Sequence, residues 1–326
     1  MKYLIFICSF TLFFHSDIKP QSNKTEIQKN IDSQKEKFEK IAKSIWTWAE
    51  VGYQEEKSTA LLKKTLSDEG FDIRSGVAEI PTAFVAEYGS GFPVIGILAE
   101  FDALPGISQS VATKRVPILD NNAGHACGHH LFGTASTAAA IAIKDYLKSS
   151  NQKGTIRLYG TPAEEGGSGK VYMVRAGLFD DVDFVLDWHA SDRNAANPGT
   201  SMANRSAKFK FYGYSAHAAG APEKARSSLD AVEAMNHMVN LLREHIPDGS
   251  RIHYVITKGG NTPNVVPDFA EVFYYVRDFN VNILENIWSR VVKAAEGAAI
   301  GTDTKVTYEI MHGNYSLLPN DAIQKV

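Results

Sequence analysis

The hydrophobic positions in the first 200 residues follow two different periods. Apolar side chains recur at helical spacing over 25–51 and over 55–69, and small apolar residues fill 132–147. Gly70 follows the second of these stretches, where a helix commonly ends. Short apolar runs typical of buried strands lie at 83–88, 94–99, 155–160 and 184–187. This alternation of helices and strands predicts an α/β domain.

From residue 207 onward the pattern predicts a β-α-β-β-α-β order, which makes a complete small domain. The expected elements are a strand at 207–213, a helix at 227–245, strands at 251–258 and 269–277, a helix at 282–299 and a strand at 304–310. The segment 194–206 contains proline and glycine and is the expected hinge. We therefore expect one domain over 21–205 and a second over 206–312.

Length, composition and charge limit the kind of protein. The 326 residues, 44% of them hydrophobic, can bury the cores of two domains. The formal net charge is -3 and there is no long basic block, which argues against nucleic acid as a partner.

The first 20 residues resemble a secretory signal peptide. Lys2 precedes the apolar run 3–14, and polar sequence follows from His15. The alternative is an apolar first strand of the mature domain. After residue 20 no span is long and apolar enough to cross a bilayer, so we expect no membrane association after signal removal. A periplasmic or secreted location is expected in preference to a cytoplasmic one.

Cysteine, histidine and glutamate residues gather in three short segments. Cys127 and His129 stand two positions apart, the pair Glu164 and Glu165 comes next, and His189 follows. A soft thiolate, imidazoles and carboxylates together suit a divalent ion such as zinc or manganese. A lone histidine or cysteine in such a segment is more often a packed core or loop residue. The joint pattern predicts a metal centre.

The spacing within this centre carries geometric expectations. In extended backbone, Cys127 and His129 would point to the same side, with Gly128 leaving space for a close approach. Glu164 and Glu165 are adjacent and are expected to point apart, one as a ligand and the other as a general base. Once a signal peptide is removed, Cys127 is the only cysteine left and has no internal disulfide partner.

These residues and their surroundings resemble the M20 family of metallopeptidases and amidohydrolases, in the branch that holds the p-aminobenzoyl-glutamate hydrolases. The matching segments are AEFDALPGISQ (99–109), NNAGHACGHHLFGTA (121–135), TPAEEGGSGK (161–170), DWHA (187–190), YSAHAAGAPEKARSSLDAV (214–232) and NTPNVVPDFAEVFYYVRD (261–278). The resemblance implies a zinc-exopeptidase-like α/β catalytic domain with an inserted β-α-β-β-α-β lid domain. It also implies that the lid domain pairs two chains into a homodimer.

The resemblance implies a role for each residue of the centre. Two divalent ions, zinc or manganese, would be held by Cys127, His129, Glu165 and His189. Glu164 falls at the position of the catalytic base. Asp102 resembles an aspartate two residues after a ligand histidine that Glu100 replaces here, so it is expected to orient a ligand without binding the metal itself.

Three residues of the second domain are also candidates. His217 resembles a histidine that stabilises the oxyanion in the partner subunit's site, although alone it would be interpreted as a surface or packed residue. Asn264 could donate to a substrate oxygen, or it could be a turn residue. Arg277 resembles a clamp for the substrate carboxylate, and the alternative is a salt bridge to Asp278 or another acid.

The resemblance also predicts an activity. We expect a metal-dependent amidohydrolase that cleaves small N-acyl or N-aroyl amino acids similar to p-aminobenzoyl-glutamate. The alternatives are a general N-acyl-amino-acid deacylase or dipeptidase, and an inactive remnant that only binds or dimerises. In the family the catalytic domain resumes after the insertion and supplies a last histidine ligand. Residues 313–326 would begin that return and His312 lies too early to be the ligand, so we expect a C-terminally truncated chain.

Overall fold

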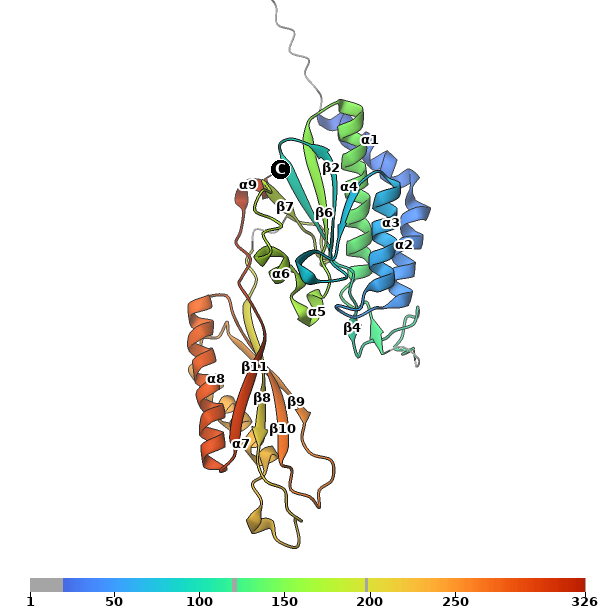
Figure 1. The fold of residues 1–326 in the computed structure, drawn as a ribbon. Coiled ribbons are helices and arrows are strands. Elements are labelled where there is room, and N and C mark those ends of the chain that lie inside the picture. The colour runs from blue at the N-terminus through green and yellow to red at the C-terminus, as the bar shows by residue number, and fades with distance from the viewer. Residues whose placement is uncertain (1–19, 119–121, 197–198, 326) are drawn as a thin grey trace, which may run out of the picture.

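The computed structural model describes residues 20–118, 122–196 and 199–325 (Figure 1). The expected signal peptide over 1–20 lies, except for its last residue, outside the described residues. Within those residues, none of the helices has the length and apolar character needed to cross a membrane.

The first part of the chain is built on a five-stranded sheet. Its strands, in spatial order, are β1 (Asp72–Ser75), β2 (Phe84–Ser90), β6 (Gly154–Gly160), β3 (Val94–Ala99) and β7 (Phe184–Leu186). Strands β6, β3 and β7 are parallel to one another, while β1 and β2 pair antiparallel. A small ribbon of β4 (Leu104–Pro105) and β5 (Ala123–Gly124) lies outside this sheet.

Helices cover both faces of the first sheet (Figure 1). The helices of this part are α1 (Pro20–Ser33), α2 (Lys35–Trp48), α3 (Glu56–Asp68), α4 (His129–Ser150), α5 (Glu164–Gly167) and α6 (Gly169–Arg175), with a short 3-10 turn η1 (Val77–Glu79). Helices α2, α3 and α4 share one core with the strands, which contains Ile45, Leu62 and Ile141. On the other face Tyr159 packs against Met173 of α6. The α/β class expected from the sequence is confirmed.

Most predicted elements of this part are present, with two differences. The single helix expected over 25–51 is two helices, because the backbone leaves the helical conformation at Gln34 (φ -102°, ψ 11°). Several short elements were not predicted, namely β1, η1, β4, β5, α5 and α6. The helix end at Gly70 is confirmed: Gly70 has φ 87°, and Phe71 N donates to Leu66 O (3.1 Å).

The second part follows the expected β-α-β-β-α-β order. Its elements are β8 (Ala203–Tyr212), η2 (Pro222–Lys224), α7 (Ser228–Leu242), η3 (Arg243–His245), β9 (Arg251–Lys258), β10 (Phe269–Asp278), α8 (Val281–Gly301) and β11 (Lys305–Asn314), and α9 (Asp321–Gln324) comes last. The antiparallel sheet has the order β11-β8-β10-β9. Alternate residues of β10 are buried against α7 and α8, so the other face of the sheet has no helix over it. Strand β8 already begins at Ala203, inside the segment expected as a hinge.

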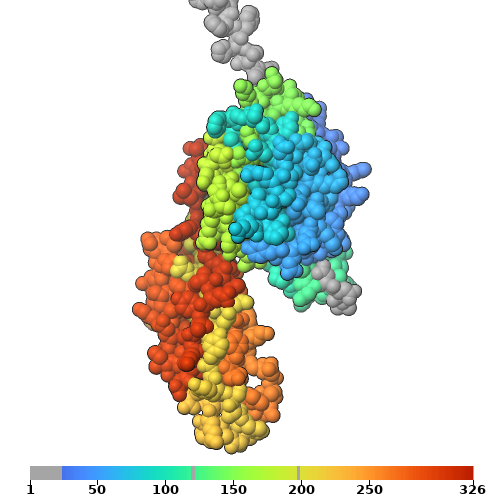
Figure 2. Space-filling model, in the orientation of Figure 1, coloured from blue at the N-terminus to red at the C-terminus, as the bar shows by residue number. Residues whose placement is uncertain are grey.

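Two segments connect the parts, and they lie side by side. Thr200 Oγ1 donates to Leu317 O (2.6 Å), and Leu317 N donates to Ser201 Oγ (3.0 Å). In the space-filling view the second part projects from the first as a separate lobe (Figure 2). The sheet of this lobe therefore has a near end, where β8 starts and β10 finishes, and a far end.

Candidate metal centre

The three parallel strands of the first sheet end at one edge, and a candidate ligand follows each of them. Glu100 follows β3, the pair Glu164 and Glu165 lies shortly after β6, and His189 lies shortly after β7. Loops after the carboxyl ends of parallel strands are where sites in open α/β sheets form. The candidate ligands therefore gather at this edge of the sheet.

His129 is at the middle of this arrangement. It is the first residue of α4, and its side chain is fully buried. The Nδ1 atom lies 2.9 Å from Asp102 Oδ1, and because an ionised carboxylate only accepts, Nδ1 carries the proton. In the neutral ring this leaves the lone pair of Nε2 free for a cation, and the buried Nε2 has the Glu100 carboxylate 3.2 Å away. This contact is the one that an aspartate orienting His129 would make.

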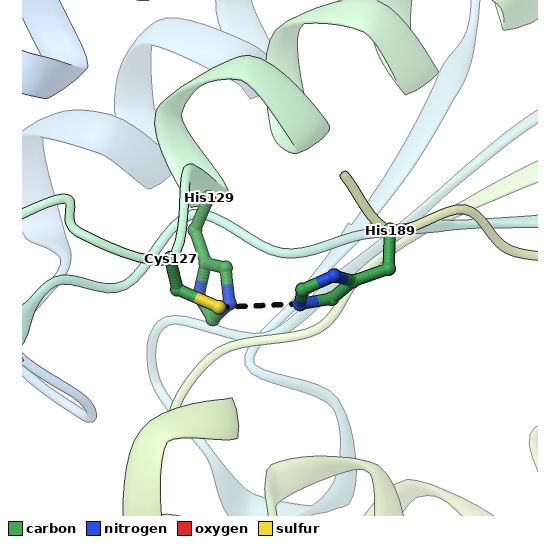
Figure 3. Close-up of side chains that lie close together, drawn as sticks. All are labelled: Cys127, His129 and His189. Atoms are coloured by element: carbon green, nitrogen blue, oxygen red, sulfur yellow. Dashed lines mark hydrogen bonds between the residues drawn. The ribbon is translucent and has the colours of Figure 1, made fainter. Parts of the chain in front are cut away.

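Cys127 and His189 complete one group of ligand atoms with His129 (Figure 3). Their ligand atoms all lie within 4.8 Å of one another, and Cys127 Sγ is 3.2 Å from His189 Nε2. His189 Nδ1 donates to the carbonyl of Ala190 (2.9 Å), so its Nε2 is also unprotonated in the neutral ring. The ring of Phe132 lies against both imidazoles and supports their positions.

The geometry that joins Cys127 to His129 is not the one expected. Gly128 has φ 97° and precedes α4, so the two ligands are brought together by a turn and not by extended backbone. A Cβ on Gly128 would make only ordinary contacts, 3.6 Å from Phe132. The glycine is therefore needed for its left-handed backbone, not for the space it leaves.

The two adjacent glutamates point to the same place, which corrects the expectation that they diverge. Glu164 Oε2 and Glu165 Oε1 lie 3.8 and 3.7 Å from His129 Nε2. The turn between them is not helical, since Glu165 has φ -73° and ψ 67°. Glu164 is the more accessible of the two, with a side chain 42% exposed against 17% for Glu165. This difference fits the expected division into a base that meets the substrate and a ligand.

Glu100 is a member of the centre to which the sequence analysis gave no role. Its Oε2 is buried, unpartnered and 3.2 Å from His129 Nε2, and its other oxygen pairs with the ammonium of Lys170. With His129 and Glu164 it forms a second group of potential ligands. An acidic residue directly after a buried strand was the available signal, and only the structure shows that it faces the histidine.

The charges around the centre favour a cation. Burial, followed by the charge of Glu165, raises the pKa of the Cys127 thiol to about 12. Burial also raises the pKa of both Glu164 and Glu165, with the charge of Glu100 adding to it. Both shifts arise because negative charges crowd a partly dry site, and a divalent ion would reverse them by stabilising the thiolate and the carboxylates. The donor set therefore fits a divalent metal.

His217 and Asn264 lie far from this centre in the same chain. Their loops pair at the far end of the second sheet, where Ala218 N donates to Asn264 O (3.0 Å) and His217 forms a bridge with Val265. Strand β8 has ten residues, so the two ends of the sheet are roughly 30 Å apart. The structure brings these two predicted residues together but does not place them in the metal centre of their own chain.

Arg277 lies at the near end of the same sheet, on the face without helices. Its guanidinium lies 5.2 Å from the centre of the Tyr275 ring, and its Nε is buried without a hydrogen bond. The alternative of a salt bridge to Asp278 is wrong, because adjacent strand residues face opposite sides and Asp278 accepts from Ser250 instead (2.6 Å). At the same end of the sheet, Asn314 Nδ2 of β11 donates to Ser168 Oγ (3.2 Å), just after the Glu164 and Glu165 turn, so this end lies beside the metal centre.

Comparisons with known proteins give the family. Residues 96–325 match the peptidase family M20/M25/M40. The chain is 43% identical over 296 residues to a p-aminobenzoyl-glutamate hydrolase subunit of Escherichia coli, which covers 90% of the chain and 62% of that protein. It is 30% identical to the human Xaa-Arg dipeptidase, over 90% of the chain and 68% of that protein.

A solved structure shows the same fold at low sequence identity. The chain superposes with a TM-score of 0.61 and 20% identity on a dinuclear metal binding peptidase of the M20 family from Bacillus subtilis, covering 89% of the chain and 77% of that protein. The family match extends over more than half of the chain and includes every residue of the candidate metal centre. The chain therefore belongs to peptidase family M20/M25/M40.

Proposed function

We propose that the protein is a metal-dependent amidohydrolase that cleaves the amide bond between an acyl or aroyl group and an amino acid. The observation that carries this proposal is the convergence of buried donor atoms without partners. Oε2 of Glu100 and Oε1 of Glu165 lie 3.2 and 3.7 Å from Nε2 of His129, and all three atoms are buried without a hydrogen bond. Cys127 and His189 meet the same histidine in one group of potential ligands. Buried polar atoms without partners are costly, so a bound cation is the simplest reason for this arrangement.

We propose that two divalent ions, zinc or manganese, occupy the centre. Thiolate and imidazole ligands suit zinc, and carboxylates suit manganese as well. Cys127, His129, Glu165 and His189 would hold the ions. Bound metal would polarise the scissile carbonyl and lower the pKa of water. The B. subtilis peptidase is described as dinuclear, which supports two ions here.

The side chains of this chain would supply the remaining chemistry. The exposed Glu164 carboxylate would accept a proton from the attacking water and deliver it to the leaving amine. Nε of Arg277 is buried without a hydrogen bond, so its guanidinium is available to bind the substrate carboxylate. The substrate would then lie between the two lobes.

We further propose that the protein is a homodimer through its second lobe. His217 and Asn264 are roughly 30 Å from the near end of their own sheet, by the rise of an extended strand. A second copy could present them to the centre, with His217 stabilising the oxyanion. The test mixes His217→Ala protein with Glu164→Gln protein, because one of the two sites in a mixed dimer would be intact. Recovered activity supports an active site that is built from residues of two subunits. No recovery after demonstrated subunit exchange contradicts it.

The test of activity uses the purified chain loaded with zinc or manganese. p-Aminobenzoyl-glutamate and N-benzoyl-glycine serve as aroyl substrates, and N-acetyl amino acids and dipeptides serve as comparisons. Preference for the aroyl compounds supports the proposal. Preference for the comparisons supports a general deacylase or dipeptidase. Metal binding without any hydrolysis would support the third alternative, an inactive protein that only binds or dimerises.

The location proposed is the periplasm or the exterior of the cell. It is supported by the charged and then apolar pattern of residues 1–20. Fractionation of cells that produce the protein, followed by N-terminal sequencing, tests it. A cytoplasmic protein that keeps its first residues would contradict this proposal.

A further inference from the structure

The turn that carries Glu164 and Glu165 has an uncommon backbone. Ala163 has φ 56° and ψ 43°, Gly166 has φ 98°, and Ser168 has φ 55°. Residues with a Cβ rarely adopt this left-handed conformation, so contacts from outside the turn must hold it. The residues that make these contacts determine where the two carboxylates point.

One such contact comes from Glu55, just before α3. Ala163 N donates to Glu55 Oε1 at 2.8 Å, and the Glu55 side chain is fully buried. Glu55 is 108 residues away from Ala163 in the chain, and it belongs to neither group of potential metal ligands. A buried side-chain oxygen aimed at a backbone N–H of the turn is well placed to fix it, because a buried N–H that lost its acceptor would cost free energy.

The same segment also contacts the other end of the turn. The hydroxyl of Tyr53 donates to Gly167 O at 2.6 Å. Gly52 packs so closely against Ala163 that a Cβ at this position would lie 2.9 Å from Ala163 Cα. Residues 52–55 therefore hold the turn at both ends.

Asp102 connects the middle of the turn to His129 through two hydrogen bonds. Glu165 N donates to Asp102 Oδ2 (2.9 Å), and the other oxygen of this aspartate bonds His129. Asp102 alone fixes only one point of the turn. If the ends were released, Glu164 and Glu165 could rotate away from His129 Nε2, because only their present backbone brings both carboxylates within 4 Å of it.

We propose that Glu55, together with Tyr53, is a positioning residue that holds the Glu164 and Glu165 turn in the shape required for metal binding. The inference rests on the proposed metal centre and adds to it residues that do not touch the metal. Partners outside the ligand set typically change metal affinity by about 10- to 100-fold when they are lost. The loss of the Glu55 acceptor is expected to fall in this range.

The experiment is a titration of the full chain with cobalt(II), followed by visible absorption and equilibrium dialysis. Glu55→Met keeps the size of the side chain but removes the acceptor, and Glu55→Gln keeps an oxygen that can accept from Ala163. Glu50→Met is the matched control, because Glu50 accepts from Lys57 N and Ser58 N at the start of α3 and makes no side-chain contact with the turn. The Cys127→Ser protein identifies the absorption that belongs to the thiolate.

We expect Glu55→Met to weaken cobalt binding by about 10- to 100-fold and to alter the spectrum. In Glu55→Gln the cobalt affinity and the spectrum should be close to those of the parent. Glu50→Met should bind cobalt as the parent does, even where its unfolding temperature is lower. Parent-like binding by Glu55→Met would overturn the proposal, and so would an equal loss in Glu55→Gln. If the parent itself binds no cobalt, the metal centre fails and the positioning role fails with it.

Tyr53→Phe provides a milder test if Glu55→Met does not fold. It removes one hydroxyl from a side chain that is already 42% exposed, so the fold should survive. We expect a smaller loss of cobalt affinity in the same direction, of several-fold. An unchanged affinity and spectrum in Tyr53→Phe would count against the positioning role of this segment.

Discussion

Replacing Glu55 with glutamine should change how the stability of the metal-free protein depends on pH. The carboxyl group of Glu55 is fully buried, and its Oε1 accepts from Ala163 N. Burial raises the pKa of Glu55 from 4.5 to about 7, although the N–H groups of Glu55 and Ala163 oppose the shift. A glutamine of nearly the same shape has no proton to lose in this range.

Whether stability rises or falls with pH depends on whether the folded or the unfolded state holds the Glu55 proton. Between about pH 4.5 and pH 7 the unfolded chain has lost the Glu55 proton while the folded protein still keeps it. Folding therefore takes up a proton, and stability falls as the pH rises through this window. One pH unit corresponds to about 1.4 kcal/mol for a single proton, so the parent should lose roughly 2 to 3 kcal/mol from pH 5 to pH 8 through this group. Above the folded pKa the contribution stays constant.

Urea unfolding of both proteins at pH 5 and pH 8, with a chelator present, measures the effect. The free energy of unfolding of the parent minus that of Glu55→Gln should be roughly 2 to 3 kcal/mol lower at pH 8 than at pH 5. Other titrating groups are common to both proteins and cancel in this difference. An equal difference at the two pH values would show that Glu55 titrates normally, and the argument from its burial would be refuted.

Three further substitutions test the centre and the substrate site. Glu164→Gln should lower kcat by about 10² to 10⁴ while the metal content stays the same, because an amide cannot accept a proton from water; near-normal turnover would remove Glu164 as the base. Cys127→Ser should retain less zinc after dialysis, as measured by metal analysis, and retention equal to the parent would mean that the cysteine is only packed. Arg277→Ala should raise KM for N-acyl amino acids by about tenfold or more and affect substrates with an amidated carboxyl group much less, and an equal effect on both would exclude a carboxylate clamp.

Local sequence patterns were sufficient to predict an element where interactions between nearby residues decide its conformation. The apolar run 94–99 is β3, and Gly70 takes the left-handed conformation after α3. In β10 the alternation of side chains separates a helix-covered face from an open face. The candidate residues of the metal centre other than Glu100 were named from the sequence, because only certain side chains bind a divalent ion and the family motifs place them. Which residues are candidate ligands therefore depends on the type of side chain and on its position in the sequence.

The tertiary structure decided how those residues meet. Helical periodicity predicts one helix through Gln34, but the helix is interrupted at this residue. Adjacency suggested that Glu164 and Glu165 diverge, yet the left-handed Ala163 and the turn after it aim both at His129.

Contacts between distant parts of the chain are the physical reason for these differences. The uncommon backbone of the glutamate turn persists because Glu55 reaches Ala163 across 108 residues, and no pattern along the chain reports that contact. The separation of His217 from the metal centre likewise depends on the length and direction of β8 in the second sheet. The sequence by itself determined which groups can do the chemistry, and the packing of the folded chain determined which of them share one site.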